Sequence, residues 1–178
     1  GTSTFQDNLS ATTTTITTGI GNFNTVSGTT TSNLQFTDNG TANLNNGLTG
    51  NVTTTADNKG TLNLVGSNNQ TVTGPVGASG ASLKEINAGN GTSTFVNDVY
   101  ATNLDVEGTG TVNLDGKFTG TAVRYNTDGT VILDDKKNID SKNCYNINIS
   151  TLELIYLQYL DNDKLKKLSW KTSIYYHK

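Results

Sequence analysis

One short unit recurs along the chain: a glycine, a threonine, two further residues and a leucine. It opens at four positions, Gly40, Gly60, Gly110 and Gly129. The steps from 40 to 60 and from 110 to 129 are about 20 residues, a period typical of solenoid repeats. In each unit a glycine turn precedes a strand with alternate apolar residues. The repetition therefore predicts a stack of short strands.

The apolar residues alternate along these segments, which places each pair on one face of a strand. The pairs are Leu34/Phe36, Ala42/Leu44, Leu62/Leu64, Leu104/Val106 and Val112/Leu114. Asn-Gly and Asp-Gly dipeptides lie between the segments, so antiparallel hairpins are an alternative. Unequal spacers and the constant direction of the Gly-Thr-x-x-Leu opening favour parallel coils. We therefore expect an all-β parallel solenoid with Leu, Val and Phe in an inner column.

A second, longer repetition links the beginning of the chain to its middle. Residues 1–12 and 91–102 are identical at seven of twelve positions, at an offset of 90. This match indicates two levels of repetition, the short unit and a longer block of several units. The Gly/Pro-rich segment 73–80 interrupts the strands, and we predict that it forms a loop protruding from the stack. Residues 82–86 suit a strand or a helical turn, and the context favours a strand.

The composition agrees with a solenoid and disagrees with a layered globular core. Hydrophobic residues make up 33% of the chain, against about 45–50% in ordinary globular domains. A solenoid needs only a narrow apolar column, because neighbouring coils also bond through their backbones. The small net charge of −3 and the periodic apolar residues argue against disorder.

The charge is divided unevenly along the chain. Residues 1–135 hold four basic and eleven acidic residues, a net charge of −7, whereas residues 136–178 hold eight lysines and four acidic residues, a net charge of +4. The acidic body argues against a nucleic-acid partner, since phosphate binding requires a basic face.

The composition changes near residue 135, which we take as a boundary between two parts. Residues 1–135 are the predicted solenoid, and residues 136–178 form a tail rich in Lys, Asn, Tyr and Leu. Apolar residues spaced by three or four predict a short amphipathic helix around 151–168. We favour an out-of-frame end of an AT-rich gene as the origin of the tail. The alternative is an evolved cap that covers the open edge of the stack.

Targeting and redox features are sparse. The only cysteine is Cys144, so no disulfide forms within the chain. No apolar run reaches about 18 residues, so no transmembrane helix is predicted. Because the chain starts at Gly1 without an initiator methionine, we interpret it as a fragment or processed chain whose targeting signals lie elsewhere.

The residues capable of acid–base, nucleophilic or ligand chemistry are scattered. They are His177, Cys144, Asp134, Asp135, Asp105, Glu107 and Asp57. The histidine and the cysteine have no nearby partners for a metal set or an activated nucleophile. Asp105 and Glu107 flank Val106 on one strand, so both are expected on a solvated outer face. We therefore predict no catalytic residue, no cofactor-binding residue and no metal site.

Two further motifs are incomplete. The calcium-binding pattern Gly-Gly-x-Gly-x-Asp is missing. Gly108-x-Gly110 and Gly19-x-Gly21 lack the third glycine and the following helix of a nucleotide-binding loop. An enzyme acting on acidic polysaccharides would need clustered basic residues and carboxylates, and residues 1–135 contain only Arg124 and three lysines.

Residues 1–135 resemble the passenger region of rickettsial autotransporter surface antigens, the surface cell antigen family that includes outer membrane protein B. The similarity lies in residues 80–89, 94–102, 110–114 and 118–120. It implies a right-handed parallel β-helix displayed on a Gram-negative surface, with roles in adhesion to and invasion of host cells and in a surface layer. Family passengers precede a C-terminal translocator barrel, whereas the tail of this chain fits neither passenger nor barrel. The resemblance carries over no catalytic residue.

The expected function is therefore that of a non-enzymatic cell-surface passenger fragment of the adhesion or surface-layer type. The expected partners are a host-cell surface protein or neighbouring surface-layer copies, with membrane attachment only through a missing translocator barrel. The expected location is the cell surface or outer membrane. One alternative is an inactive remnant of a split or frameshifted autotransporter gene, and a less favoured one is a β-helix enzyme acting on polysaccharides.

Overall fold

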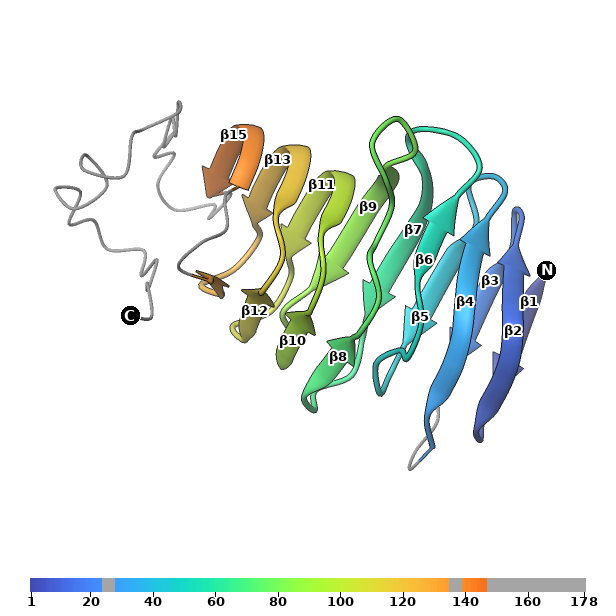
Figure 1. Ribbon diagram of the computed structural model, residues 1–178. Helices are drawn as coiled ribbons and strands as arrows, with labels where there is room; N and C mark the ends of the chain where they lie inside the picture. Colours follow the sequence, from blue (N-terminus) through green and yellow to red (C-terminus); the bar gives the residue numbers. More distant parts are fainter. Residues whose placement is uncertain (24–27, 135–138, 147–178) are drawn as a thin grey trace, which may run out of the picture.

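The chain folds into a parallel β-solenoid of about 7 turns, as a computed structural model shows (Figure 1). The structure describes residues 1–23, 28–134 and 139–146. All regular elements in these residues are strands. In Figure 1 the strands nearer the viewer rise and those behind them descend while the stack advances from right to left, so the path is right-handed. The expected all-β solenoid is confirmed.

The described residues form fifteen strands. They are β1 (Thr2–Phe5), β2 (Leu9–Ile16), β3 (Ile20–Phe23), β4 (Thr30–Phe36), β5 (Thr41–Leu44), β6 (Val52–Thr54), β7 (Lys59–Leu64), β8 (Gln70–Val72), β9 (Leu83–Ala88), β10 (Thr92–Phe95), β11 (Val99–Val106), β12 (Thr111–Leu114), β13 (Phe118–Tyr125), β14 (Thr130–Leu133) and β15 (Ile139–Asn146). Most are short because each coil turns a corner after a few residues.

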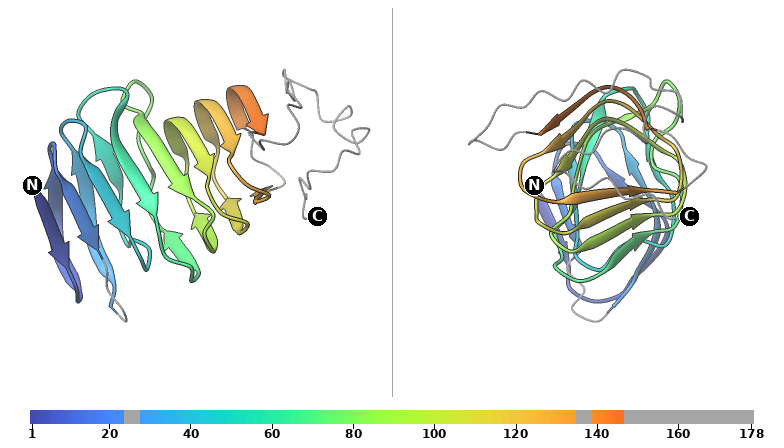
Figure 2. Two further views of the ribbon diagram at one scale, coloured as in Figure 1. Left: turned by 180° about the vertical axis from the view of Figure 1, so that it is seen from behind. Right: turned by 90° about the vertical axis from the view of Figure 1, so that its left-hand side faces the viewer.

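The strands lie in three sheets around the stack (Figure 2). The long sheet has the order β1-β3-β5-β7-β9-β11-β13-β15, the three-stranded sheet β2-β4-β6 and the four-stranded sheet β8-β10-β12-β14. Every pairing between these strands is parallel. The hairpin alternative therefore does not describe this stack.

The face of the three-stranded sheet continues beyond β6 through single bridges. Val52 pairs with Val76, and Val76 pairs with Val99 at the start of β11. The last residues of β11 pair instead in the long sheet. The eight-residue strands β11 and β13 thus bend over the corner between two faces.

The coil length can be followed in the register of the long sheet. The successive partners of Thr2 are Ile20, Thr41, Thr61, Glu85, Asn103, Ala122 and Asn143. The steps range from 18 residues, between Thr2 and Ile20, to 24 residues, between Thr61 and Glu85. The predicted period of about 20 residues is therefore the length of one coil.

The core is one continuous column inside the stack. In most strands alternate residues face it. The largest fully buried side chains are Phe23, Phe36, Phe95, Phe118, Leu34, Leu44, Leu62, Leu64, Leu83, Ile86, Leu104 and Leu114. The predicted inner column is confirmed. Because the column is narrow, a chain with one third hydrophobic residues fills it.

The predicted loop at 73–80 lies partly inside the stack. Val76 is fully buried and paired on both sides. Only the segment beyond it leaves the coil, where Ala78 and Ala81 bond to each other through both backbone amides at 3.0 Å. The chain re-enters the long sheet at β9, as the strand alternative for residues 82–86 predicts.

The recurring Gly-Thr-x-x-Leu units do not all occupy the same face. The units at Gly40 and Gly60 lead into β5 and β7 of the long sheet, whereas those at Gly110 and Gly129 lead into β12 and β14 of the four-stranded sheet. The long match behaves in the same way: Thr2–Phe5 is in the long sheet and Thr92–Phe95 in the four-stranded sheet. An offset of 90 is therefore not a whole number of coils, which corrects the interpretation as a block repeat. The repeated element is a short strand with alternate buried residues, which occurs in both sheets.

Strand pairing continues past residue 135, because β15 pairs with β13 in parallel. The predicted helix around residues 151–168 lies outside the described residues.

Candidate functional site

A row of asparagines lies on the outer face of the long sheet. Asn22, Asn43, Asn63 and Asn87 stand in register on β3, β5, β7 and β9. Asn43, Asn63 and Asn87 each donate from Nδ2 to Oδ1 of the preceding asparagine at 2.7 Å. Asn22 donates to Oγ1 of Thr4 at 3.4 Å. We call this row the asparagine ladder.

The ladder points all its amides in one direction. Each Oδ1 faces the following coil, and aligned amides polarise one another. Nδ2 of Asn87 also donates to Oε1 of Glu85 at 3.2 Å. Within the described residues, Oδ1 of Asn87 receives no hydrogen bond. Asn87 is therefore the last residue of the ladder, and its side-chain oxygen is free to accept a hydrogen bond.

Charged residues continue the row beyond the ladder. Asp105 on β11 is opposite Arg124 on β13. The guanidinium donates from Nε to Oδ1 at 2.5 Å and from Nη2 to Oδ2 at 2.7 Å. Nη2 also lies 3.6 Å from Oε2 of Glu85. The side chain of Arg124 thus lies back over two coils and covers Asp105, which is only 6% exposed.

Burial raises the pKa of Asp105 above its usual value, because the carboxylate loses contact with water. The hydrogen bonds and the charge of Arg124 act in the opposite direction, and the negative charges of Glu85 and Glu107 raise the pKa further. Two carboxylates, those of Asp105 and Glu85, therefore lie beside one guanidinium, and with Glu107 this part of the face is net negative.

The sequence-based expectation for Asp105 was wrong. Glu107 is exposed and accepts a hydrogen bond from Nδ2 of Asn126 at 2.6 Å. Asp105 is buried, because Arg124 from the next coil lies over it. The spacing of 19 residues between them, about one coil, is a sequence signal for this pair.

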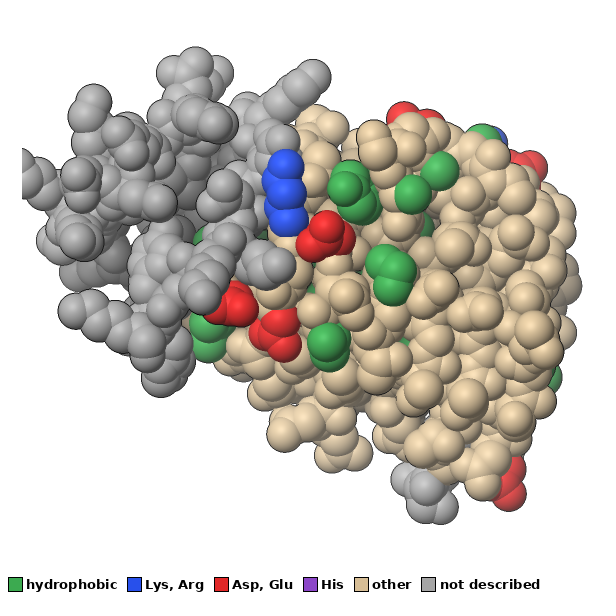
Figure 3. Space-filling model, viewed as in Figure 1, with side chains coloured by type: hydrophobic (Ala, Val, Ile, Leu, Met, Phe, Trp, Pro, Cys, Tyr) green, Lys and Arg blue, Asp and Glu red, His purple; other side chains and the backbone are tan. Residues whose placement is uncertain are grey.

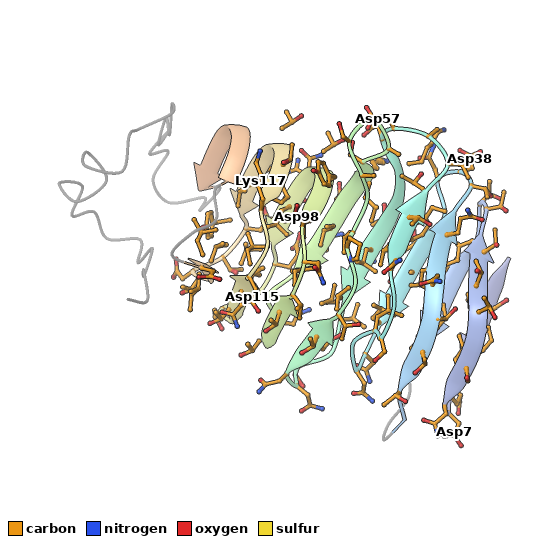
Figure 4. The ribbon with its side chains drawn as sticks, viewed as in Figure 1. Asp7, Asp38, Asp57, Asp98, Asp115 and Lys117 are labelled. Atoms are coloured by element: carbon orange, nitrogen blue, oxygen red, sulfur yellow. The ribbon has the colours of Figure 1, made fainter. Side chains whose placement is uncertain are left out.

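Asp57 takes part in a contact between two loops at the upper corner in Figure 4. Its Oδ1 accepts hydrogen bonds from the backbone N of Ser82, at 3.0 Å, and from the Ser82 hydroxyl. These bonds lower the pKa of Asp57. Next to it, Asn58 donates its backbone N–H to the carbonyl of Ser82 at 2.9 Å and accepts from Thr102 Oγ1 at 3.0 Å. The carboxylate thus fixes the loops.

The remaining candidates are not brought together. Asp134 is exposed and directly follows β14. Cys144 is on β15, opposite Val123. Asp135 and His177 lie outside the described residues. Gly108 and Gly110 form part of a corner before the short strand β12, without a helix.

A hollow of about 390 Å³ lies at the corner that follows the long sheet. It is lined by Asn63, Leu64, Val65, Asn87, Asn90 and Glu107. A second hollow of about 170 Å³ lies beside Phe5 and Phe23 at the first coil. The first hollow adjoins both the end of the ladder and the carboxylate of Glu107, so it combines amide, acid and apolar groups.

The face of the three-stranded sheet carries few charges. Figure 3 shows it covered largely by side chains other than hydrophobic and charged ones. Thr31, Asn33, Gln35 and Thr53 point outward there from β4 and β6. This face presents hydroxyls and amides in rows.

Among the described residues, no group of three or more His, Cys, Asp or Glu side chains is placed to hold a metal ion. In the same part of the chain, no helix is long and apolar enough to cross a membrane. Comparisons with protein-family models, with curated proteins and with solved structures found no match.

Proposed function

We propose that this chain is a non-enzymatic binding module of the cell-surface passenger type, which works through its extended polar faces. The observation that carries the proposal is the solenoid itself, in which one apolar column supports three outer faces of threonine, asparagine and glutamine side chains. The resemblance to autotransporter passengers supports the same function. The module acts at the cell surface, and its partners are a host-cell surface protein or neighbouring copies.

The outer faces suit a binding interface in which many side chains contact the partner at once. Strands in a sheet lie about 4.8 Å apart, so outward side chains of successive coils form regular rows. Hydroxyls and amides in these rows both donate and accept hydrogen bonds. Each bond contributes only about 0.5–1.5 kcal/mol, so binding requires many of them at once. A rigid face loses little entropy when it binds, which favours such contacts.

The arrangement of the acids supports a non-enzymatic role. The buried carboxylate of Asp105 is held by Arg124, and that of Asp57 is held by Ser82. General acid–base catalysis requires a carboxyl group within reach of a substrate. The hydrogen bonds of these two groups fix the structure instead.

A binding assay with the full chain tests the proposal. Purified chain is added to fixed host cells, and bound protein is measured over a range of concentrations. Saturable binding above the level of heat-unfolded chain is expected. Binding that never exceeds that level contradicts the proposal.

An inactive remnant of a split gene is the alternative. It is distinguished by the downstream DNA read in all three frames. Resumed Gly-Thr-x-x-Leu units in another frame, followed by a barrel, would support the remnant, and so would a folded chain that binds no cell. Release of sugars from acidic polysaccharides would instead indicate an enzyme.

A further inference from the structure

The corner hollow of about 390 Å³ lies where three successive coils leave the long sheet. Val65, Gly89 and Glu107 directly follow the strand ends Leu64, Ala88 and Val106. They therefore hold equivalent positions in three successive coils. Val65 and Glu107 are exposed, whereas Gly89 between them has no side chain. The hollow lined by Asn63, Leu64, Val65, Asn87, Asn90 and Glu107 is called the corner notch.

The glycine is required at this position. Gly89 has a φ of +98°, in the region that L-residues rarely adopt. A Cβ on Gly89 would also lie 3.0 Å from Cγ1 of the buried Val106. The positive φ and the close contact with the buried column therefore both favour glycine at this corner.

The unused polar atoms around the notch include two acceptor oxygens. Oδ1 of Asn87, at the end of the asparagine ladder, and Oε2 of Glu107 receive no hydrogen bond from the described residues. Asn90 lies exposed at the rim. The charges of Glu85, Asp105 and Glu107 outnumber the single charge of Arg124, and Arg124 is already bonded to Asp105. The notch therefore favours a cation that donates hydrogen bonds.

One wall of the notch is apolar. Val65 is 42% exposed, and the buried Leu64 adjoins it. Apolar surface beside a carboxylate matches a group with an aliphatic stem and a charged tip, which is the form of a lysine side chain.

We propose that the corner notch binds an exposed lysine side chain of a partner protein. The ammonium donates to Oε2 of Glu107 and to Oδ1 of Asn87, and the methylenes lie on Val65. A lysine ammonium supplies three donors and no acceptor, which matches the unused acceptors better than a sugar hydroxyl does. This inference rests on the proposed function and names the chemistry of one contact.

The test is an NMR titration of the full chain with a short peptide that contains one central lysine between glycines. Two reference peptides carry acetyl-lysine or arginine at the same place. Saturable shifts at Asn87, Asn90 and Glu107 are expected with the lysine peptide, and weaker ones with the references. Higher ionic strength weakens the binding, since the contact is partly exposed.

Substitutions in the notch test which side chains contact the lysine. Glu107→Gln keeps an oxygen for Asn126 but removes the charge, and about two- to fivefold weaker binding is expected for an exposed pair. Val65→Ser removes the apolar wall and also weakens binding. Asp115→Asn is the matched control, because it removes an exposed negative charge that directly follows β12 of the four-stranded sheet and does not line the notch. Figure 4 labels this residue. The control is expected to bind as the wild type does.

Several results would overturn the inference. They are equal shifts with the acetylated peptide, unchanged affinity in Glu107→Gln, or shifts in the notch with a neutral oligosaccharide and none with the lysine peptide. Cell binding by the wild-type chain without lysine-peptide binding would reject the notch and leave the proposed function standing.

Discussion

Arg124 and Asp105 are paired across neighbouring coils, with Nη2 of the arginine 2.7 Å from Oδ2 of the aspartate. The two residues are opposite each other in the parallel ladder of β11 and β13. Only 8% of the aspartate side chain and 29% of the arginine side chain are exposed. The pair therefore joins two coils on the outside of the stack, while the apolar column joins them on the inside.

Replacing Arg124 with alanine is expected to destabilise the chain by about 2–3 kcal/mol, because a nearly buried carboxylate loses its cation. Urea unfolding followed by circular dichroism measures the change. Lys84→Ala removes an exposed positive charge from β9 and should change the free energy of unfolding by less than about 0.5 kcal/mol. Equal effects of the two substitutions would show that the pair contributes nothing specific.

The raised pKa of Asp105 predicts a pH dependence with a definite sign. The folded state holds a proton on this group more tightly than the unfolded state, whose pKa is near the usual value of 3.8. The ionised carboxylate therefore costs stability above the raised pKa, and this cost is relieved as the pH falls towards 3.8. Wild type should gain stability relative to Asp105→Asn over that window. If the stability difference between wild type and Asp105→Asn stays constant with pH, or changes in the opposite direction, the raised pKa of Asp105 is contradicted.

Much of the fold follows from local patterns. Alternation in pairs such as Leu62 and Leu64 identifies the buried side of each strand, and the spacing of the glycine units equals one coil. Both depend on neighbouring residues alone. Assignment of a strand to a face depends instead on the summed length of all preceding corners. For this reason the units at Gly60 and Gly110 have equivalent patterns but belong to different sheets.

The candidate site was less predictable for the same reason. Burial of Asp105 requires Arg124 to be in register one coil later, and the corner notch brings together Val65, Asn87 and Glu107 from three successive coils. Coils of 18 to 24 residues do not allow such registers to be counted from sequence. From the sequence alone, Asp105 is therefore expected in solvent, and no notch is expected at this corner.

The asparagine ladder predicts a loss of stability at Asn63. This side chain donates to Asn43 and accepts from Asn87, both at 2.7 Å. Asn63→Ala removes two half-buried hydrogen bonds and should cost about 1–2 kcal/mol in chemical unfolding. Asn113 donates a single bond, to Thr94 at 3.1 Å, so Asn113→Ala should cost less. A smaller loss at Asn63 than at Asn113 would show that the ladder adds nothing.

Two glycines with the same backbone angle provide a further test. Gly60 and Gly80 both have a φ of +76°. A Cβ on Gly60 would overlap the Phe36 ring, whereas a Cβ on Gly80 would meet nothing within 4 Å. Gly80→Ala should therefore cost only the backbone strain of about 1 kcal/mol. Gly60→Ala should cost about 3 kcal/mol or more, because the ring must also move. Similar melting temperatures for the two variants would contradict this packing.

The pentapeptide Gly-Thr-Ser-Thr-Phe occurs twice, and its two phenylalanines have different surroundings. Phe95 is 1% exposed inside the column, between coils on both sides. Phe5 is half-buried in the first coil and stacks on Phe23 with ring centroids 5.2 Å apart.

Phe95→Ala should therefore cost about 3–5 kcal/mol, the range for a large cavity in a core. Phe5→Ala should cost about 1–2 kcal/mol, because it removes one aromatic contact and part of the buried area. Thermal unfolding of both variants measures the difference. Equal losses would contradict the difference in burial between the two phenylalanines.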